Sequence, residues 1–371
     1  MAATRPFHPD VRILGAGIIG MTLALLWARQ GLRVQLVGSI AAPARPDVRA
    51  YAINHAGRDT LSSVGGWPLD PTAATPVSQM RVFGDGSGAI RFRAPMQDEL
   101  TWIVDVPQIV ATLQQQVGQA ANIEVLDSCP DAAVGLTVIC EGRETTSRAA
   151  AGLEVVRKRY GHDALATRVM ADHPHRGTAW QWFTGDSILG LLPMGGEHGR
   201  ELAVVWSQAT KHTEFWREQD VHALSDALSS ASHHALGRLQ VHAPVASWPL
   251  IYTRAKRWVA PGVALAGDAA HTVHPLAGQG LNLGLADVAE LARICGARPN
   301  WCPVGDWRLL RRYARARALP TRLMQDGTDA LYLLFDSDLP IAAPLRNWGL
   351  SLANRSEWFK RAAMAPARRA S

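Results

Sequence analysis

The chain has 371 residues, 47% of them hydrophobic, which is enough for about two domains with a sizeable buried core. Its formal net charge is +6, but outside the C-terminal region the Lys and Arg residues are spread along the chain, which argues against nucleic-acid binding. The four cysteines show no CxxC pair or zinc-ligand spacing, so no metal site is predicted. Because no secretory signal or long apolar run is present, we expect a cytoplasmic protein, with peripheral contact at the inner face of a membrane left open.

The first predicted elements form a βαβ unit. A strand over Val11–Leu14 leads through the glycine-rich turn Gly15–Gly20 into a helix over Met21–Gln30 and a second strand over Leu32–Val37. Such a unit opens a doubly wound parallel sheet. Residues 76–95 then alternate apolar and polar side chains about a Gly-Asp-Gly turn, which predicts a hairpin.

Strands dominate the middle of the chain and helices its end. The remaining predicted elements are a helix over Val106–Val117, strands over Ile123–Leu126, Leu136–Ile139, Thr178–Phe183, Ile188–Leu192 and Glu201–Trp206, a helix over Asp220–Leu236, strands over Ala243–Tyr252 and Val263–Ala266, and helices from near Gly280, over Trp307–Arg317 and over Arg322–Phe335. This order predicts an α/β fold: a doubly wound, Rossmann-like sheet with an inserted antiparallel β-sheet domain and C-terminal helices. We assign residues 1–75, 96–150 and 247–300 to the nucleotide-binding domain, 76–95 and 151–246 to a substrate domain, and 301–371 to the helical region.

Three glycines between the first strand and the first helix have the spacing of a dinucleotide-binding turn. Gly15 permits a tight turn, Gly17 lets the backbone approach a pyrophosphate, and Gly20 allows the helix to pack closely on the sheet. The N-terminus of the helix favours the negative charge of that pyrophosphate. The motif predicts a bound dinucleotide, although an ordinary glycine turn is the alternative.

A second motif extends from Gly267 to Gly284 and is more specific. A strand that ends at Asp268 presents a carboxylate to sugar-like hydroxyl groups, and Pro275 directs the chain across a planar ligand. Gly278 and Gly280 let the backbone pass close to that ligand. The helix that follows points its N-terminus at the same place, where it stabilises an anion such as the edge of a reduced flavin.

Together the two motifs resemble the class A flavoprotein monooxygenases, which share the para-hydroxybenzoate hydroxylase fold. The resemblance is strongest to the ubiquinone-biosynthesis hydroxylases, which act on polyprenylated phenols. It covers nearly the whole chain. Beyond the glycines it rests on 49–54, 66–67, 160–162, 177–180, 191–193, on Leu309, Tyr313 and Arg317, and on 344–364.

The resemblance implies FAD as the cofactor and assigns roles to residues of both motifs. The diphosphate would lie against the first turn, and Arg49 near the diphosphate and the flavin. Gly267 and Asp268 would bind the ribityl or diphosphate part. The cofactor-binding residues implied are Gly15, Gly17, Ile18, Ile19, Gly20, Arg49, Gly267, Asp268, Pro275, Gly278, Gly280, Leu281 and Asn282, and those beside the reacting part of the ring are Pro275, Gly278 and Gln279.

The implied reaction is hydroxylation of an aromatic ring, with NAD(P)H as co-substrate and O2 as oxidant. The substrate would be a phenol or an isoprenoid phenol such as a ubiquinone precursor. Because the cofactor carries the hard chemistry, the protein needs no catalytic triad. We therefore interpret His271 and His274 as structural residues rather than as bases.

Three positions depart from the family pattern. Gly38 stands where the second strand usually ends in an acidic residue that binds the adenosine ribose. Val110 stands where Arg or Gln usually faces the cofactor, and Glu141 replaces Asp in the segment 139–142. The first two changes predict weaker binding of the adenosine end of FAD.

These departures keep other functions open. One is a non-catalytic relative that serves as a scaffold or lipid carrier in a biosynthetic complex, and another is a flavin-dependent reductase. Residues 345–369 mix aromatic and basic side chains, which predicts either contact with an anionic membrane surface or a helix with a solvated basic face. A homodimer is also left open.

Overall fold

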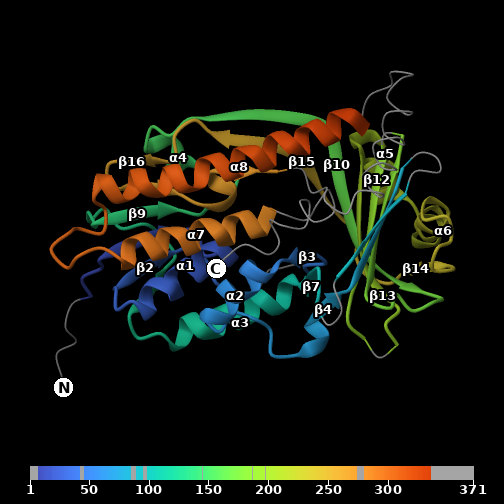
Figure 1. Ribbon diagram of the computed structural model, residues 1–371, viewed down its shortest axis with the longest axis horizontal. Coiled ribbons are helices and arrows are strands. Elements are labelled where there is room, and N and C mark those ends of the chain that lie inside the picture. Colours follow the sequence, from blue (N-terminus) through green and yellow to red (C-terminus); the bar gives the residue numbers. More distant parts are fainter. Residues whose placement is uncertain are drawn as a thin grey trace.

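The computed structural model describes residues 7–41, 46–84, 89–94, 98–143, 145–185, 187–196, 198–273 and 280–335. Figure 1 shows a parallel sheet with its helices on one side of the molecule and a large antiparallel sheet on the other. Helix α8 runs along the upper edge of this view. The predicted α/β fold with an inserted antiparallel sheet is therefore confirmed.

The first sheet has six strands in the order β16-β17-β9-β1-β2-β8, and all neighbours are parallel except β16 and β17. Its strands are β1 (Val11–Leu14), β2 (Val34–Val37), β8 (Ile123–Leu126), β9 (Leu136–Ile139), β16 (Val259–Ala260) and β17 (Val263–Leu265). Helices α1 (Ile18–Arg29), α3 (Val106–Gln119) and α7 (Gly280–Gly296) contribute buried side chains to the same core. The prediction that the short apolar runs of this region form strands is confirmed. Parallel strands covered by helices are apolar on both faces, so they appear in the sequence as continuous apolar runs.

Residues 127–135 connect β8 to β9 without forming a strand. The connection is fixed by Arg12 of β1, which is only 5% exposed and donates to the carbonyl of Ala132 at 2.8 Å. The same guanidinium donates to Gln35 Oε1 of β2 at 3.0 and 3.1 Å. A buried cation therefore stabilises this short crossing segment through hydrogen bonds on both sides.

The second sheet has nine strands, with the path β18-β15-β10-β13-β12-β11-β5-β6 and β14 beside β10. They are β5 (Gln79–Phe83), β6 (Ala89–Arg93), β10 (Val155–Ala171), β11 (Thr178–Thr184), β12 (Ser187–Pro193), β13 (Glu201–Ala209), β14 (Leu239–Val241), β15 (Ala246–Ala255) and β18 (His271–Thr272). Helix α6 (Val221–Ala231) packs on one face, and α5 (Thr210–Glu218) lies beside β10 and β13. Trp180, Trp182 and Trp206 are buried in the core with α6, so these indoles serve packing.

Strands β10 and β15 form a long antiparallel ribbon. Gly161 adopts φ +77° within β10, where the register shifts between Arg159 and Asp163. The far end of β15 pairs with β18 through Thr253 and Thr272. Although the expected boundary at residue 247 assigned β15 to the nucleotide-binding domain, its pairing joins it to the antiparallel sheet. The ribbon thus connects this sheet to the second glycine motif.

A three-stranded sheet in the order β3-β7-β4 belongs to neither of the larger sheets. It consists of β3 (Ala50–Ile53), β7 (Thr101–Asp105) and β4 (Ala74–Val77), with α2 (His55–Ser63) after β3 and the short helix η1 (Pro71–Ala73) before β4. The predicted hairpin is present as β5 and β6, but residues 76 and 77 pair with β7 instead. The expected start of the hairpin at residue 76 is therefore wrong, because β4 completes a different sheet.

Helix α8 (Trp307–Phe335) is a single helix with Pro320 inside it, whereas the sequence predicts two helices. Pro320 removes one backbone hydrogen bond, but contacts on both sides of it hold the helix in place. Before it, the Tyr313 hydroxyl donates to Leu265 O at 2.8 Å. After it, Gln325 Nε2 donates to Thr253 O at 2.8 Å and to Thr272 O at 3.0 Å. No helix among the described residues is long and apolar enough to cross a membrane.

Candidate functional site

The first glycine turn packs as its spacing predicts. Gly15 has φ +106°, and a Cβ there would lie 2.5 Å from the carbonyl oxygen of Cys140, at the end of β9. A Cβ at Gly20 would lie 1.8 Å from the Gly15 carbonyl oxygen. Both positions therefore require glycine for packing alone, whatever the turn binds.

Gly17 differs from these two residues because a Cβ there would meet nothing within 4 Å. It is the N-cap residue of α1, its φ is an ordinary −77°, and it supplies no side chain to cap the helix. The first turn of this 12-residue helix therefore has no capping side chain, and its N-cap residue has open space where a Cβ would stand. This is the cradle that a diphosphate needs, since the helix N-terminus provides both hydrogen-bond donors and a favourable dipole.

The second glycine motif lies directly against the first. Ile19 of α1 packs between its two glycines: a Cβ would come 3.3 Å from Ile19 Cγ1 at Gly267 and 2.7 Å from Ile19 Cδ1 at Gly284. Gly267 begins the short helix η2 (Gly267–Ala269) with φ +62°. The side chain of Ile19 therefore acts in packing, and it sets the distance between the two motifs.

Asp268 follows Gly267 on η2 and keeps 48% of its side-chain surface exposed. Arg143 lies opposite, with its Nε 3.7 Å from Asp268 Oδ2. The surrounding protein crowds the carboxyl and raises the pKa of Asp268, while the positive charges of Arg143, His271 and Arg49 oppose that rise. The Asp268 side chain is thus partly open to solvent and has one cationic neighbour, Arg143, at 3.7 Å.

A buried ion network holds η2 in place. Asp287 of α7 is fully buried and accepts hydrogen bonds from the Gly267 backbone N–H at 3.0 Å and Arg317 Nε at 2.8 Å. His271 Nε2 lies 2.6 Å from Asp287 Oδ2, the same oxygen that accepts from the Gly267 N–H, whereas Arg317 contacts Oδ1. Burial alone would raise the pKa of Asp287, but the contacts with His271 and Arg317 outweigh it and hold the pKa below its usual value. His271 is thus structural, as expected.

Sequence reasoning missed Asp287, although the chain offered a signal. The residue stands in an otherwise apolar stretch of the predicted helix, between Leu285 and Val288. A carboxylate on the buried face of a helix must find partners, so its position alone indicates an ion pair. The residue acts by positioning the turn that carries Asp268.

Arg49 approaches the site from the other side. Its guanidinium forms a double hydrogen bond with Asp47, with Nη2–Oδ2 at 2.6 Å and Nε–Oδ1 at 2.9 Å, and lies 5.8 Å above the centre of the Trp248 ring. Its hydrogen bond with Asp47 raises the pKa of Arg49. Because Trp248 belongs to β15, Arg49 bridges the start of β3 and the antiparallel sheet, and its positive charge is among those that oppose the rise in the pKa of Asp268.

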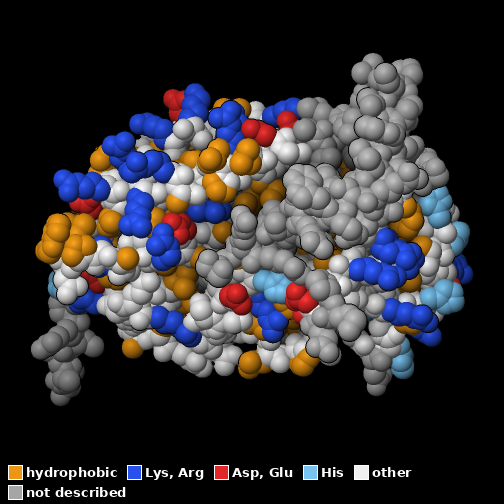
Figure 2. Space-filling model, in the orientation of Figure 1, with side chains coloured by type: hydrophobic (Ala, Val, Ile, Leu, Met, Phe, Trp, Pro, Cys, Tyr) orange, Lys and Arg blue, Asp and Glu red, His pale blue; other side chains and the backbone are white. Residues whose placement is uncertain are grey.

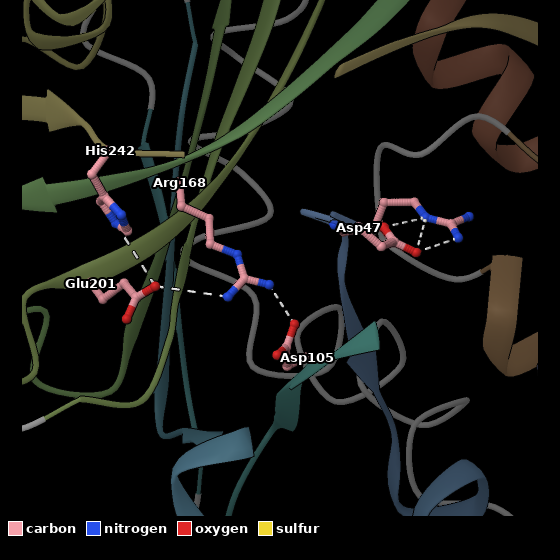
Figure 3. Close-up of polar contacts among 6 residues, drawn as sticks. Asp47, Asp105, Arg168, Glu201 and His242 are labelled. Carbon is pink, nitrogen blue, oxygen red and sulfur yellow. Dashed lines mark hydrogen bonds and ion pairs between the residues drawn. The ribbon is translucent and has the colours of Figure 1, made fainter. Parts of the chain in front are cut away.

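A second polar cluster lies between the three-stranded sheet and the antiparallel sheet, as Figure 3 shows. Arg168 of β10 donates to Asp105, which ends β7 and precedes α3, and lies 3.8 Å from Glu201 of β13. His242 approaches the same Glu201 oxygen at 3.8 Å. Burial raises the pKa of Asp105, and Arg168 opposes the rise. The cluster joins the three-stranded sheet to the antiparallel sheet, and the sequence analysis did not find it.

At the start of α7, Gly280 and Leu281 follow directly on the undescribed segment 274–279, and Leu281 packs partly buried against the core. Asn282 is 5% exposed. Its side-chain Nδ2 donates to Ala52 O at 2.8 Å, and its Oδ1 accepts a hydrogen bond from the Asn54 backbone N–H at 3.0 Å. The Asn282 side chain therefore ties α7 to β3. Four residues that the sequence analysis singled out, His274, Pro275, Gly278 and Gln279, lie outside the described residues.

The three departures from the family pattern have distinct surroundings. Gly38 has φ +135°, and a Cβ there would lie 3.0 Å from Ala16 N, so the end of β2 packs against the first glycine turn. Val110 is partly buried against the main core. Glu141 accepts hydrogen bonds from Thr145 and Ser147 at the start of α4 (Thr146–Ala150), so its carboxylate is engaged locally.

Comparison with known proteins identifies the family of the chain. The FAD binding domain family matches residues 107–325, more than half of the chain. The chain is 28% identical to the 3-demethoxyubiquinol 3-hydroxylase of Escherichia coli K12, over 96% of this chain and 97% of that protein. It is also 28% identical to the ubiquinone hydroxylase UbiL of Rhodospirillum rubrum, over 95% and 87% of the two chains.

Solved structures share the fold. PqsL of Pseudomonas aeruginosa, described as a probable FAD-dependent monooxygenase, superposes with a TM-score of 0.75 at 21% identity, over 92% of this chain and 99% of that one. The p-nitrophenol 4-monooxygenase PnpA of Pseudomonas putida gives a TM-score of 0.76 at 16% identity, over 98% and 99%. The chain belongs to the FAD binding domain family, among the class A flavoprotein monooxygenases that its sequence resembles.

Proposed function

We propose that this protein is an FAD-dependent hydroxylase that uses NAD(P)H and O2 to hydroxylate a phenol bearing an isoprenoid chain, such as a ubiquinone precursor. The observation that carries the proposal is the packing of the two glycine motifs against each other through Ile19, with no atom within 4 Å of a Cβ placed at Gly17, the N-cap of α1. The names of the relatives from Escherichia coli and Rhodospirillum rubrum support the substrate class.

Bound FAD supplies the redox chemistry, in which O2 gives one oxygen atom to the ring and the other to water while NAD(P)H provides two electrons. The ring exchanges a hydrogen for a hydroxyl group, and the water takes up the second oxygen atom together with one proton from solvent, while NAD(P)H becomes NAD(P)⁺. The residues of this chain bind and orient. Gly17 and the N-terminus of α1 would hold the diphosphate, and Asp268 the ribityl or ribose hydroxyls.

The remaining assignments follow the family pattern. Arg49 would neutralise negative charge near the diphosphate or the flavin. Pro275, Gly278 and Gln279 would lie against the reacting part of the ring, with the backbone of 280–282 beside them. The antiparallel sheet would cover the substrate and exclude water, which prevents wasteful reduction of O2.

The test is turnover of a phenol that carries a short prenyl chain, in the presence of FAD, NAD(P)H and isotopically labelled O2. The proposal predicts that the phenol accelerates NAD(P)H oxidation and that the product gains one labelled oxygen atom. Equal NAD(P)H oxidation with and without the phenol, with hydrogen peroxide as the only product, would instead identify a flavin-dependent reductase.

A scaffold or lipid-carrier role is the second candidate, because Gly38 lacks the carboxylate expected at the adenosine ribose. Loss of one charged hydrogen bond costs about 1.5–3 kcal/mol, or roughly one to two decades in affinity. A protein that gains no thermal stability from added FAD would support this candidate. The expected membrane contact of residues 345–369 lies outside the described residues, and a homodimer remains a proposal that gel filtration tests.

A further inference from the structure

Helix α8 has two faces of different character. Its inner face carries Tyr313, Arg317 and Gln325, whose hydrogen bonds hold β17, Asp287 and the β15–β18 pair. Its outer face carries four exposed arginines. These are Arg308, Arg311, Arg312 and Arg315, which we call the basic face of α8. Their spacing of three or four residues places them on one side of the helix.

The basic face of α8 lacks neutralising partners within the described part of the chain. No described carboxylate pairs with any of its four arginines, whereas Arg322, one turn beyond Leu319, pairs with Asp326 at 3.4 Å. Figure 2 shows Lys and Arg side chains gathered at the upper left of the molecule, in the region where Figure 1 places α8. Four neighbouring like charges repel each other. An anionic partner would reduce this electrostatic repulsion, which no described carboxylate neutralises.

Exposed apolar side chains surround the same face. Of the nine large hydrophobic side chains that are exposed among the described residues, four lie between residues 301 and 323. Trp301, in the connection from α7 to α8, is 81% exposed, and Trp307, at the start of α8, is 45% exposed. Leu319 and Leu323 are 62% and 65% exposed and continue the outer stripe.

We propose that the basic face of α8, with Trp301 and Trp307 beside it, docks the protein on an anionic phospholipid surface. Arginines attract anionic headgroups, and indole rings prefer the boundary between headgroups and acyl chains. A second copy of this chain is a poor occupant, because two basic faces would repel each other. An acidic protein would satisfy the arginines but would leave the exposed indoles and leucines unexplained.

The docking surface is independent of the proposed hydroxylation, because it rests on α8 and not on the flavin site. The two are nevertheless joined by one helix. The inner face of α8 bonds Asp287, which holds the turn that carries Asp268. Docking would therefore place the flavin-binding edge of the molecule close to the phase in which an isoprenoid substrate dissolves.

The test is flotation of the full chain with two kinds of vesicle, pure phosphatidylcholine and phosphatidylcholine in which part is replaced by phosphatidylglycerol. The proposal predicts flotation only with the anionic vesicles and release as salt rises. Changing the four arginines of the basic face together to glutamine should weaken the partition at least about tenfold, since each basic residue near such a surface contributes roughly fivefold. Trp301→Ala should weaken it further.

Two matched controls show whether a loss of flotation is specific to the basic face of α8, or follows from removing any four positive charges or any exposed apolar side chain. The first removes four positive charges elsewhere on the surface: Arg91→Gln, Arg93→Gln, Lys211→Gln and Arg217→Gln. The second is Leu69→Ala, at a side chain 94% exposed. Both should float as the unchanged protein does. Equal loss of flotation in the four-charge control and in the basic-face variant would overturn the proposal. It would also be overturned if the unchanged protein fails to float with anionic vesicles at low salt and binds an acidic protein instead. Neither result bears on hydroxylation, which is measured separately.

Discussion

Gly17 and Gly20 lie three residues apart on the same turn, yet they have opposite tolerance for a side chain. A Cβ at Gly20 would overlap the Gly15 carbonyl oxygen at 1.8 Å, while a Cβ at Gly17 would meet nothing within 4 Å. The motif alone predicts that all three glycines matter. Only the structure separates Gly15 and Gly20, which the packing of the fold requires to be glycine, from Gly17, where a Cβ would meet no atom within 4 Å.

At Gly38 the missing acidic residue cannot simply be restored. We predict that Gly38→Glu lowers the free energy of unfolding by about 1–3 kcal/mol, the cost of holding a residue other than glycine at positive φ. It should not tighten FAD binding, because the end of β2 must shift away from Ala16 to admit the side chain. Urea unfolding and FAD titration of the variant measure both effects. A tenfold gain in FAD affinity with unchanged stability would contradict this account of β2.

Asp287 connects three elements, because from α7 it accepts hydrogen bonds from Gly267 of η2 and Arg317 of α8. We predict that Asp287→Asn lowers the free energy of unfolding by about 3–5 kcal/mol at neutral pH, because it leaves the buried guanidinium of Arg317 without its carboxylate and removes the carboxylate contact of His271. FAD binding should weaken as well, since the Gly267 N–H loses its acceptor. The conservative Arg317→Lys variant should lose less stability than Asp287→Asn.

The same residue predicts a pH dependence. Because the pKa of Asp287 is lower in the folded protein than its usual value, its contribution to stability is complete above an unfolded-state pKa of about 3.9 and is lost as the pH falls through the folded value. Urea unfolding at a series of acidic pH values should therefore show a steeper loss below about pH 4 for the unchanged protein than for Asp287→Asn. Parallel curves for the two proteins would show that Asp287 does not carry this dependence.

Pro320 tests whether α8 is one helix. Within a helix, proline removes a hydrogen bond and crowds the preceding turn, so we predict that Pro320→Ala raises the free energy of unfolding by about 1–2 kcal/mol. Leu323→Ala, at an exposed position on the same helix, should change it by less than about 0.5 kcal/mol. If Pro320→Ala instead destabilises the protein, the chain has two helices with a break, as the sequence alone predicts.

Elements were predictable from sequence where the local pattern decides the structure. Strands β8 and β9 match their predicted bounds, because each is a short apolar run between turns. Helix α6 ends at Ala231, five residues before the predicted end, since His233 and His234 adopt positive φ. Helix α8 continues through Pro320 because of contacts with β17, β15 and β18. Such contacts come from distant segments, so no local pattern reveals them.

At the scale of the molecule, the glycine motifs predicted a candidate site but not the contacts that hold the two motifs together. Glycine spacing predicted the close packing at Gly20, and the structure adds Ile19 as the contact between α1 and the second motif. The junction of Arg168 with Asp105 joins residues 63 positions apart, through the pairing of two separate sheets. Which strands pair across such distances depends on the whole topology, so the pairing of β15 with β10 could not be read from the sequence.

The central claim is that FAD binds with its diphosphate at the open N-terminus of α1. Titration of the protein with FAD, followed by flavin absorbance and fluorescence, tests it most directly when Gly17→Val is titrated beside the unchanged protein. We predict saturable binding of one FAD per chain, weakened roughly tenfold to a hundredfold by Gly17→Val, with the free energy of unfolding lowered by only about 1 kcal/mol because valine is a poorer N-cap residue than glycine. Absence of FAD binding, or equal affinity in the two proteins, would contradict the account.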